Sequence, residues 1–320
     1  MLHRDWPVPQ IEDYIRGLPI WQGTPRLEPL VGGLQNRNYV VTDGAGKYVA
    51  RVAGELLDIW GVPTSINSAM RAASEIGVSP KLRYSETYLS IIDFIEGKNL
   101  AAEELRDLKT VETIVGMIRR IQTEGSPLAH HPISYFNPFD ACRHAAWIAN
   151  ERGSKRMDEI GPLIEVVGKL ETHFGLFKPV LCHCDMAYVN VMRDTAGKLW
   201  IIDWDLCGFG PPQWDIAEMC AYAQVPDEID RHTVRCYFGA LKAADFEQHL
   251  FEHRALKMTS YIRIAILCWV LEAAGGSLAS EEVAASMAEN FADWGSGYDD
   301  FARAEIAGFD TVWKAYGNQY

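Results

Sequence analysis

The first hundred residues carry short apolar runs separated by turn residues, a pattern typical of β-strands. The strand-like runs are 27–31, 39–41, 48–52 and 88–95. The Asp-Gly-Ala-Gly sequence at 43–46 is a strong hairpin signal between two of them. Residues 66–76 have helical spacing and stop at Gly77, the residue type that commonly ends a helix. This part of the chain is predicted to form a small, mostly antiparallel sheet with one helix.

The pattern changes after Gly97, where apolar residues begin to recur at helical spacing. The repeat is first seen at Val111, Ile114, Val115, Ile118 and Ile121. The further predicted helices cover about 141–151, 158–174, 228–243, 245–274, 280–293 and 298–316. Strand-like runs interrupt them only at 180–182 and 199–202. We therefore predict an N-terminal lobe of residues 1–97 and a larger, mainly helical C-terminal lobe of residues 98–320.

Composition indicates the compartment and the partners to be expected. The 320 residues carry a formal net charge of −13, which disfavours binding to nucleic acid or anionic lipid. Seven cysteines show neither a disulfide framework nor the spacing of a four-ligand zinc site, so free thiols in a reducing compartment are expected. The N-terminal residues lack an apolar signal core, and the most apolar run, 264–271, is too short to span a bilayer. These features predict a cytoplasmic protein with no membrane partner.

Residues 183–205 hold the strongest chemical signal. His183-x-Asp185 is followed by Asn190 after four residues, and Asp203 lies at the end of the apolar strand-like run. A hairpin between runs 180–182 and 199–202 would bring the three oxygen-bearing side chains of Asp185, Asn190 and Asp203 to one edge. Carboxylate and amide oxygens suit Mg²⁺. One carboxylate would then be left to accept a hydroxyl proton. The alternative is that these residues only form turns and a strand-end cap.

The chain resembles the aminoglycoside phosphotransferase/choline kinase superfamily, a branch of the protein-kinase-like fold. Residues 183–190 look like its catalytic loop, and 202–205 look like its metal-binding segment. Gly32-Gly33-Leu34-Gln35-Asn36-Arg37-Asn38-Tyr39 is similar to the phosphate-covering turn of choline kinase-like members. Arg51 stands where protein kinases carry the lysine of the third strand, and 94–97 looks like the hinge between lobes.

The resemblance implies an α+β, bilobal fold, with a five-stranded antiparallel N-terminal sheet over a helical C-terminal lobe and ATP between them. Asp185 would be the catalytic base, while Asn190 and Asp203 would hold Mg²⁺. The residues implied to bind the nucleotide are Gly33, Asn36, Asn38, Arg51, Phe94 and Ile95. Asp205 is a weaker candidate for a second metal, water or substrate contact. Asp215 and His183 would brace and orient the catalytic loop.

One departure from the kinase pattern concerns the partner of Arg51. Protein kinases pair the basic residue of the third strand with a glutamate of the following helix. Here the helix offers Glu75 at its C-terminal end, and Ile66 stands at the expected position. We therefore assign no such ion pair, and Glu55 is one alternative partner.

The acceptor is predicted to be a small amino alcohol, with choline or ethanolamine as the leading class. Choline kinase-like members hold an ammonium group in a box of aromatic faces with an acidic residue nearby. Tyr222 and Trp269 resemble residues of that pocket, although aromatic residues at helical spacing are also common in cores. The enzymatic alternative is an aminoglycoside or another amino-sugar. The non-enzymatic alternative is a nucleotide-binding pseudokinase. A preference for GTP and the oligomeric state are left open.

Overall fold

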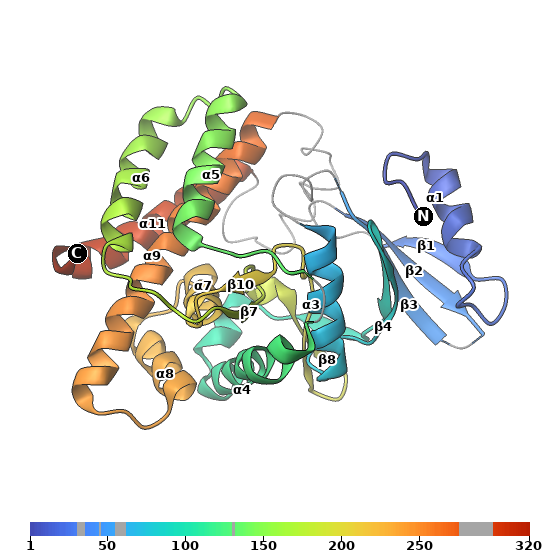
Figure 1. Cartoon of the computed structure of the whole chain (residues 1–320), viewed down its shortest axis with the longest axis horizontal. Coiled ribbons are helices and arrows are strands. Elements are labelled where there is room, and N and C mark those ends of the chain that lie inside the picture. Colours follow the sequence, from blue (N-terminus) through green and yellow to red (C-terminus); the bar gives the residue numbers. More distant parts are fainter. Residues whose placement is uncertain (31–35, 45, 55–61, 130–131, 275–296) are drawn as a thin grey trace.

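The N-terminal part is built around one antiparallel sheet, seen on the right of the computed structural model in Figure 1. The structure describes residues 1–30, 36–44, 46–54, 62–129, 132–274 and 297–320. Five strands lie in the order β1-β2-β3-β5-β4, as the resemblance implied. They are β1 (Arg26–Leu30), β2 (Arg37–Asp43), β3 (Gly46–Val52), β4 (Leu82–Glu86) and β5 (Leu89–Asp93). The predicted hairpin is confirmed, because Asp43 pairs with Gly46 where β2 turns into β3.

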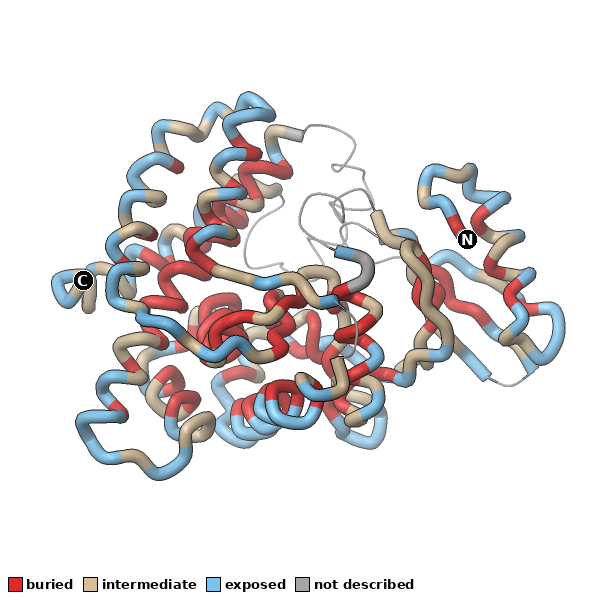
Figure 2. The backbone as a smooth tube through the Cα atoms, viewed as in Figure 1, coloured by how far each residue is buried: buried red, intermediate tan, exposed pale blue. Residues whose placement is uncertain are grey.

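Two helices accompany this sheet. The predicted helix is α3 (Pro63–Glu75), while α1 (Val8–Arg16) was not predicted. Buried Ile11 and Ile15 of α1 pack with Val41, Ala50 and other sheet residues in a small core of their own. Helix α3 belongs instead to the large core of the C-terminal part. Figure 2 shows the two buried zones as separate red regions.

The C-terminal part is mainly helical. Its helices are α4 (Leu108–Arg120), α5 (Pro138–Glu151), α6 (Met157–Glu171), α7 (Trp214–Tyr222), α8 (Asp227–Phe238), α9 (Ala243–Ala274) and α11 (Tyr298–Tyr316). The helical repeat that begins at Val111 is confirmed, since α4 buries Val111, Ile114, Val115 and Ile118 on one face. The helix predicted at 280–293 lies outside the described residues. No helix among the described residues is long and apolar enough to cross a membrane.

Short strands join this helical part, and their pairing differs from the prediction. They are β6 (Gly97–Asn99), β7 (Val180–Cys182), β8 (Val191–Asp194), β9 (Leu199–Ile201) and β10 (Gly208–Gly210). The expected hairpin between β7 and β9 is wrong, because β7 pairs with β10 and β9 pairs with β8. Runs β8 and β10 are too short and too mixed in character to be found by periodicity. Strand β6 completes a sheet in the order β6-β8-β9.

Gly97 is required where the chain passes from the first sheet to the second. A Cβ atom at this position would lie 2.2 Å from the carbonyl oxygen of Arg193 on β8. Only glycine allows this close approach of two backbones. The lobe boundary that we place here stays a prediction.

Candidate active site

The β8–β9 hairpin positions the predicted metal-binding residues. Asn190 immediately precedes β8, and Asp203 follows β9 after Ile202. The backbone N–H of Ile202 donates to the carbonyl oxygen of Asn190 at 2.9 Å, so the two ends of the hairpin are joined. Asn190 and Asp203 are therefore brought together by this hairpin and not by the one expected between β7 and β9.

Asp185 is held between two donors. The side-chain amide of Asn190 donates to Oδ2 of Asp185 at 3.0 Å, and the hydroxyl of Tyr222 donates to Oδ1 at 2.7 Å. Burial, followed by the nearby Asp185 carboxylate, raises the pKa of Tyr222 well above its ordinary value. The phenol therefore keeps its proton and remains a donor. Of the two predicted substrate-contacting aromatic residues, Tyr222 is thus brought directly to the predicted base.

Helix α7 supports the catalytic loop along one face. Its residues 215, 218 and 222 follow helical spacing, and each contacts the loop. Asp215 accepts from the backbone N–H groups of His183 at 2.9 Å and Cys184 at 3.0 Å. Glu218 accepts from the backbone N–H of Met186 at 2.9 Å. These are the contacts expected of residues that brace a loop, the role we anticipated for Asp215.

His183 orients the same loop through its ring. Its Nε2 lies 2.8 Å from the carbonyl oxygen of Ile202, and the ring packs edge-on against Trp204. Cys184 and Asp203 both adopt the left-handed backbone region, with φ of 61° and 64°. Such residues carry about 1–3 kcal/mol of strain and persist only where the surrounding structure holds them. The hydrogen bonds to Asp215 supply part of that support at Cys184.

Arg51 of β3 pairs with two aspartates of the predicted metal-binding segment. One of its terminal nitrogens, Nη2, lies 2.5 Å from Asp203 Oδ1 and 2.6 Å from Asp205 Oδ2. Burial disfavours the charged guanidinium, but the two carboxylates outweigh that effect and raise the pKa of Arg51 above its ordinary value. Burial raises the pKa of Asp205, and Arg51 offsets this only in part. The ion-pair partner that sequence reasoning could not assign therefore comes from the loop after β9.

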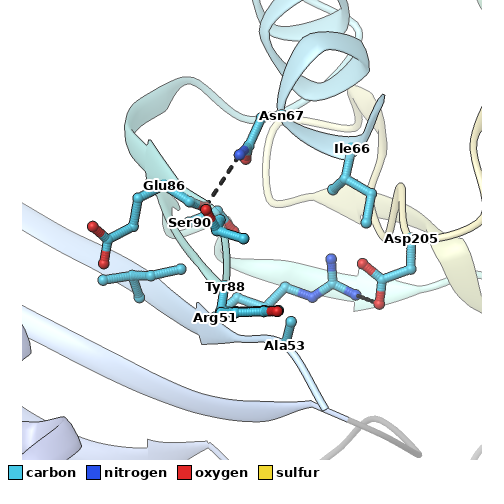
Figure 3. A pocket seen from close by; sticks show the side chains of 10 residues that line it. Arg51, Ala53, Ile66, Asn67, Glu86, Tyr88, Ser90 and Asp205 are labelled. Atoms are coloured by element: carbon cyan, nitrogen blue, oxygen red, sulfur yellow. Dashed lines mark hydrogen bonds and ion pairs between the residues drawn. The ribbon is translucent and has the colours of Figure 1, made fainter. Parts of the chain in front are cut away.

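The departure from the kinase pattern at α3 is visible in Figure 3. Ile66 lines the same small pocket as Arg51 and Asp205, so an apolar side chain stands at the position where a glutamate was sought. Glu75 lies in a different groove, and Glu55 is outside the described residues. Asp205 takes the place of the helix carboxylate as a partner of Arg51. The sequence signal that would have found it is the second acidic residue in Asp203-Trp204-Asp205.

The other predicted nucleotide-binding residues do not all lie beside Arg51. Asn36 donates to Asp205 Oδ2 at 2.9 Å and accepts from the backbone N–H of Gly54 at 3.0 Å, which links the phosphate-covering turn to Arg51's partner. Asn38 pairs with Arg51 in the β2–β3 register. Gly33 lies outside the described residues. Phe94 and Ile95 line a groove with the end of α3 and Trp200, separate from the pocket that contains Arg51.

Trp269, the second aromatic candidate, contacts residues of α11. Its indole N–H donates to Asp299 at 2.9 Å, and the guanidinium of Arg303 lies 5.5 Å from its ring. The side chain is buried. Glu272, three residues further along α9, pairs with Arg156.

The sequence analysis did not predict one buried ion pair beside the site. Arg263 of α9 donates to Glu218 at 2.7 Å, and both side chains are buried. Burial raises the pKa of Glu218, and Arg263 opposes that rise. The signal was available, because both residues interrupt apolar stretches of the sequence.

The site geometry can be compared with known proteins. The model of the phosphotransferase enzyme family matches residues 26–248, which is most of the chain and includes every residue of the catalytic loop. The chain belongs to the phosphotransferase enzyme family.

Members of this phosphotransferase family include similar sequences and structures. A probable choline kinase of Arabidopsis thaliana is 27% identical over 229 residues; the match covers 64% of this chain and 64% of that relative, less than two thirds of its length. The crystal structure of a choline/ethanolamine kinase family protein from Mesorhizobium loti is 17% identical, with a TM-score of 0.69 and coverage of 96% and 94% of the two chains. Choline kinase LicA from Streptococcus pneumoniae is 16% identical, with a TM-score of 0.69 and coverage of 95% and 98%. LicA has also been solved in complex with AMP. At these identities the structures show a shared fold.

Proposed function

We propose that this chain is a phosphotransferase that uses ATP and Mg²⁺ to phosphorylate the hydroxyl group of a small amino alcohol, with choline or ethanolamine as the leading substrates. The observation that carries the proposal is the environment of Asp185. Its carboxylate accepts hydrogen bonds from Asn190 and Tyr222. The β8–β9 hairpin begins directly after Asn190, and Asp203 follows that hairpin. Membership of the phosphotransferase enzyme family supports the same reaction class.

The roles follow from the groups that are present. Asp185 orients the acceptor hydroxyl and accepts its proton, since its two oxygens are already aligned by neutral donors. Tyr222 and Asn190 keep that carboxylate in place. Arg51 provides positive charge for the phosphate groups, and its guanidinium fork suits bidentate contact with phosphate oxygens. This requires Arg51 to exchange at least one of its carboxylate partners for a phosphate.

The residues also fit a magnesium ion. Asp203 offers a partly exposed carboxylate. The amide nitrogen of Asn190 is engaged with Asp185, which leaves the amide oxygen as the donor for a metal. These are hard oxygen ligands of the kind that Mg²⁺ prefers, and Asp205 is a further candidate. When bound, Mg²⁺ neutralises the charge of the phosphate groups during transfer.

A buried carboxyl group on α11, close to Glu218, is a candidate contact for a cationic acceptor. Glu305 of α11 is fully buried, and neither of its carboxyl oxygens has a hydrogen-bond partner among the described residues. Burial, and then the neighbouring Glu218, raise the pKa of Glu305 well above its ordinary range. The neutral acid is therefore favoured, and an ammonium group bound beside it would favour the ionised carboxylate and pair with it. Kinases of choline and ethanolamine among the similar proteins are consistent with this substrate class.

Glu305→Gln tests that assignment. We expect the KM for choline or ethanolamine to rise about tenfold or more, because a neutral amide no longer compensates the ammonium charge, whereas kcat changes less. Steady-state kinetics with varied acceptor at saturating ATP measure both values. An unchanged KM would remove Glu305 from the acceptor site without affecting the proposed reaction.

The deciding experiment is acceptor-dependent ADP release by the purified protein with Mg²⁺ and ATP. Choline, ethanolamine and a panel of aminoglycosides are compared. We expect turnover with an amino alcohol, reduced at least about 10³-fold in Asp185→Asn, because the amide cannot accept the hydroxyl proton. Asp310→Asn, an exposed carboxyl on α11, is the matched control and should retain full activity.

The alternatives give different results in the same assay. Turnover with aminoglycosides alone would keep the role of Asp185 but reject the amino-alcohol assignment. Binding of ATP without turnover on any acceptor, in wild type and Asp185→Asn alike, would support a pseudokinase and overturn the proposal.

A further inference from the structure

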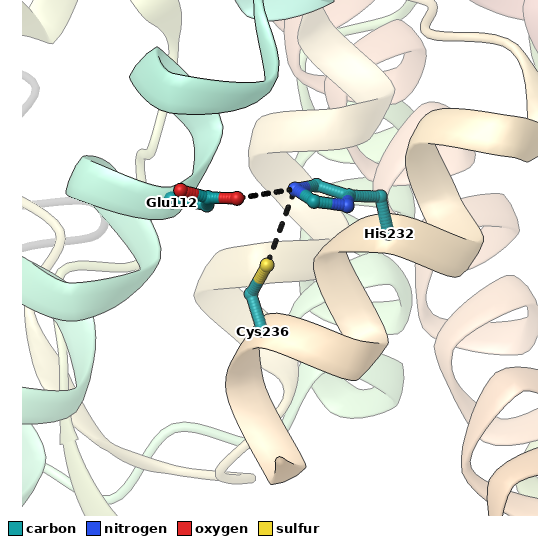
Figure 4. A group of neighbouring side chains, drawn as sticks. All are labelled: Glu112, His232 and Cys236. Atoms are coloured by element: carbon teal, nitrogen blue, oxygen red, sulfur yellow. Dashed lines mark hydrogen bonds and ion pairs between the residues drawn. The ribbon is translucent and has the colours of Figure 1, made fainter. Parts of the chain in front are cut away.

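A second group of potential metal ligands lies away from the catalytic loop, between α4 and α8. Glu112 projects from α4, while His232 and Cys236 stand four residues apart on α8 and therefore share one face of that helix. Their ligand atoms all lie within 4.8 Å of one another. Figure 4 shows the three side chains converging from the two helices. All three are at least partly accessible to solvent.

Hydrogen bonding alone does not satisfy both contacts of the His232 ring nitrogen. Nε2 of His232 lies 3.3 Å from Glu112 Oε1 and 3.3 Å from Cys236 Sγ. A protonated Nε2 has one proton to share between the two neighbours, whereas an unprotonated Nε2 can accept from the thiol but then has no proton for Glu112. The oxygen distance is also at the long end for a nitrogen–oxygen hydrogen bond.

The same distances suit shared coordination. With Zn–N and Zn–O bonds of about 2.0–2.1 Å and a Zn–S bond of about 2.3 Å, the edges of a tetrahedron measure roughly 3.3–3.6 Å. The two measured separations are close to these edges. Three protein ligands would leave one position for water.

The donor types identify the metal class. A thiol and an imidazole select a borderline or soft ion such as Zn²⁺, whereas Mg²⁺ prefers oxygen ligands alone. We propose that Glu112, His232 and Cys236 form a zinc-binding site that joins α4 to α8. This site is chemically distinct from the oxygen ligands offered by Asn190 and Asp203.

A second cluster of similar composition provides a contrast. Cys220, Asp230 and His253 also lie close together, but they are fully buried. The ammonium group of Lys257 lies 2.8 Å from Asp230 and already fills the position of a cation. The Glu112 cluster has no lysine or arginine ion pair of this kind among the described contacts.

The proposed ion has a structural path to the catalytic loop. Tyr237, next to Cys236, donates its hydroxyl to the side chain of Gln122. Gln122 in turn donates to the carbonyl oxygen of Pro212 at 2.8 Å, just before α7 begins. Zinc would therefore stabilise the elements that support α7.

Cobalt provides a direct probe, because a thiolate bound to Co²⁺ gives a charge-transfer absorption in the near ultraviolet. The full-length protein is freed of metal with a chelator and titrated with Co²⁺ alone. We expect the absorption to saturate at about one equivalent, to be abolished by added Zn²⁺ and to be unaffected by Mg²⁺. Saturating Zn²⁺ should also raise the melting temperature by about 3 °C or more.

Variants separate this site from other metal binding. Cys236→Ser should abolish the charge-transfer band, and His232→Ala and Glu112→Gln should each weaken Co²⁺ binding at least about tenfold. His249→Ala is the matched control, since His249 lies 3.3 Å from Glu252 without a neighbouring thiol, and it should bind Co²⁺ as wild type does. Circular dichroism checks that each variant is folded. The proposal would be overturned if wild type showed no band or if folded Cys236→Ser kept it. A band of undiminished strength in folded His232→Ala would also overturn it.

Discussion

At the scale of single residues, Arg51 has the least expected position. One nitrogen of its guanidinium contacts both Asp203 and Asp205, and the side chain is mostly buried. A buried arginine with two acidic partners is held firmly, yet the proposed reaction needs it at the phosphate groups. The ion pairs therefore place Arg51 beside the predicted metal-binding segment.

Arg51→Met tests both roles. We expect kcat/KM for ATP to fall about 10²-fold or more, because the phosphate groups lose a charged donor. The melting temperature should also fall, because Asp203 and Asp205 are left uncompensated. Activity is measured by ADP release and stability by thermal denaturation.

A double variant separates these effects. Adding Asp205→Asn to Arg51→Met should recover part of the stability without recovering activity, since it removes one uncompensated carboxylate. Unchanged kinetics in Arg51→Met would contradict a role at the nucleotide and leave Arg51 as a structural residue.

At the scale of elements, α7 determines the shape of the catalytic loop. Asp215, Glu218 and Tyr222 bind successive parts of that loop from one helical face. The helix is buried along its whole length, so its position is set by packing against the C-terminal core. Arg263 of α9 completes the arrangement by neutralising Glu218.

Arg263→Met is expected to destabilise the protein by about 3–5 kcal/mol, because Glu218 remains as an unpaired buried charge. The free energy of unfolding is measured by urea denaturation. Glu218→Gln combined with Arg263→Met should be more stable than Arg263→Met alone, although the altered contact to Met186 should still reduce kcat. If the double variant were no more stable than Arg263→Met, the unpaired charge of Glu218 would not be the cause of the lost stability.

At the scale of the whole molecule, the sequence predicted elements better than their pairing. The strands β2 and β3 and the helix α4 were found because their periodicity is strong and local. The partners of β7 and β9 were missed because pairing is a long-range property that short apolar runs do not encode. Chemical spacing identified Asp185, Asn190 and Asp203, but the roles of these residues and the 97/98 lobe boundary stay predictions.

The contacts of the site residues were less predictable than their identities. Sequence reasoning sought the partner of Arg51 on α3, whereas the structure provides it from the loop after β9, more than one hundred and fifty residues away. The contact of Trp269 with an ammonium substrate stays a prediction, and the contact of its ring with Arg303 was not foreseen from the sequence. Such pairings depend on tertiary packing, which the local spacing of residues in a single sequence does not specify.

The distribution of charge around the catalytic loop has a consequence for how a nucleotide arrives. Among the described residues of the site, the carboxylates of Asp185, Asp203, Asp205 and Glu218 outnumber the guanidinium groups of Arg51 and Arg263. A bare polyphosphate would meet repulsion that these two guanidinium groups cannot offset. If the proposed function holds, we therefore expect divalent cations and nucleotide to be taken up as one complex, and nucleotide in excess of its cation to remain largely unbound.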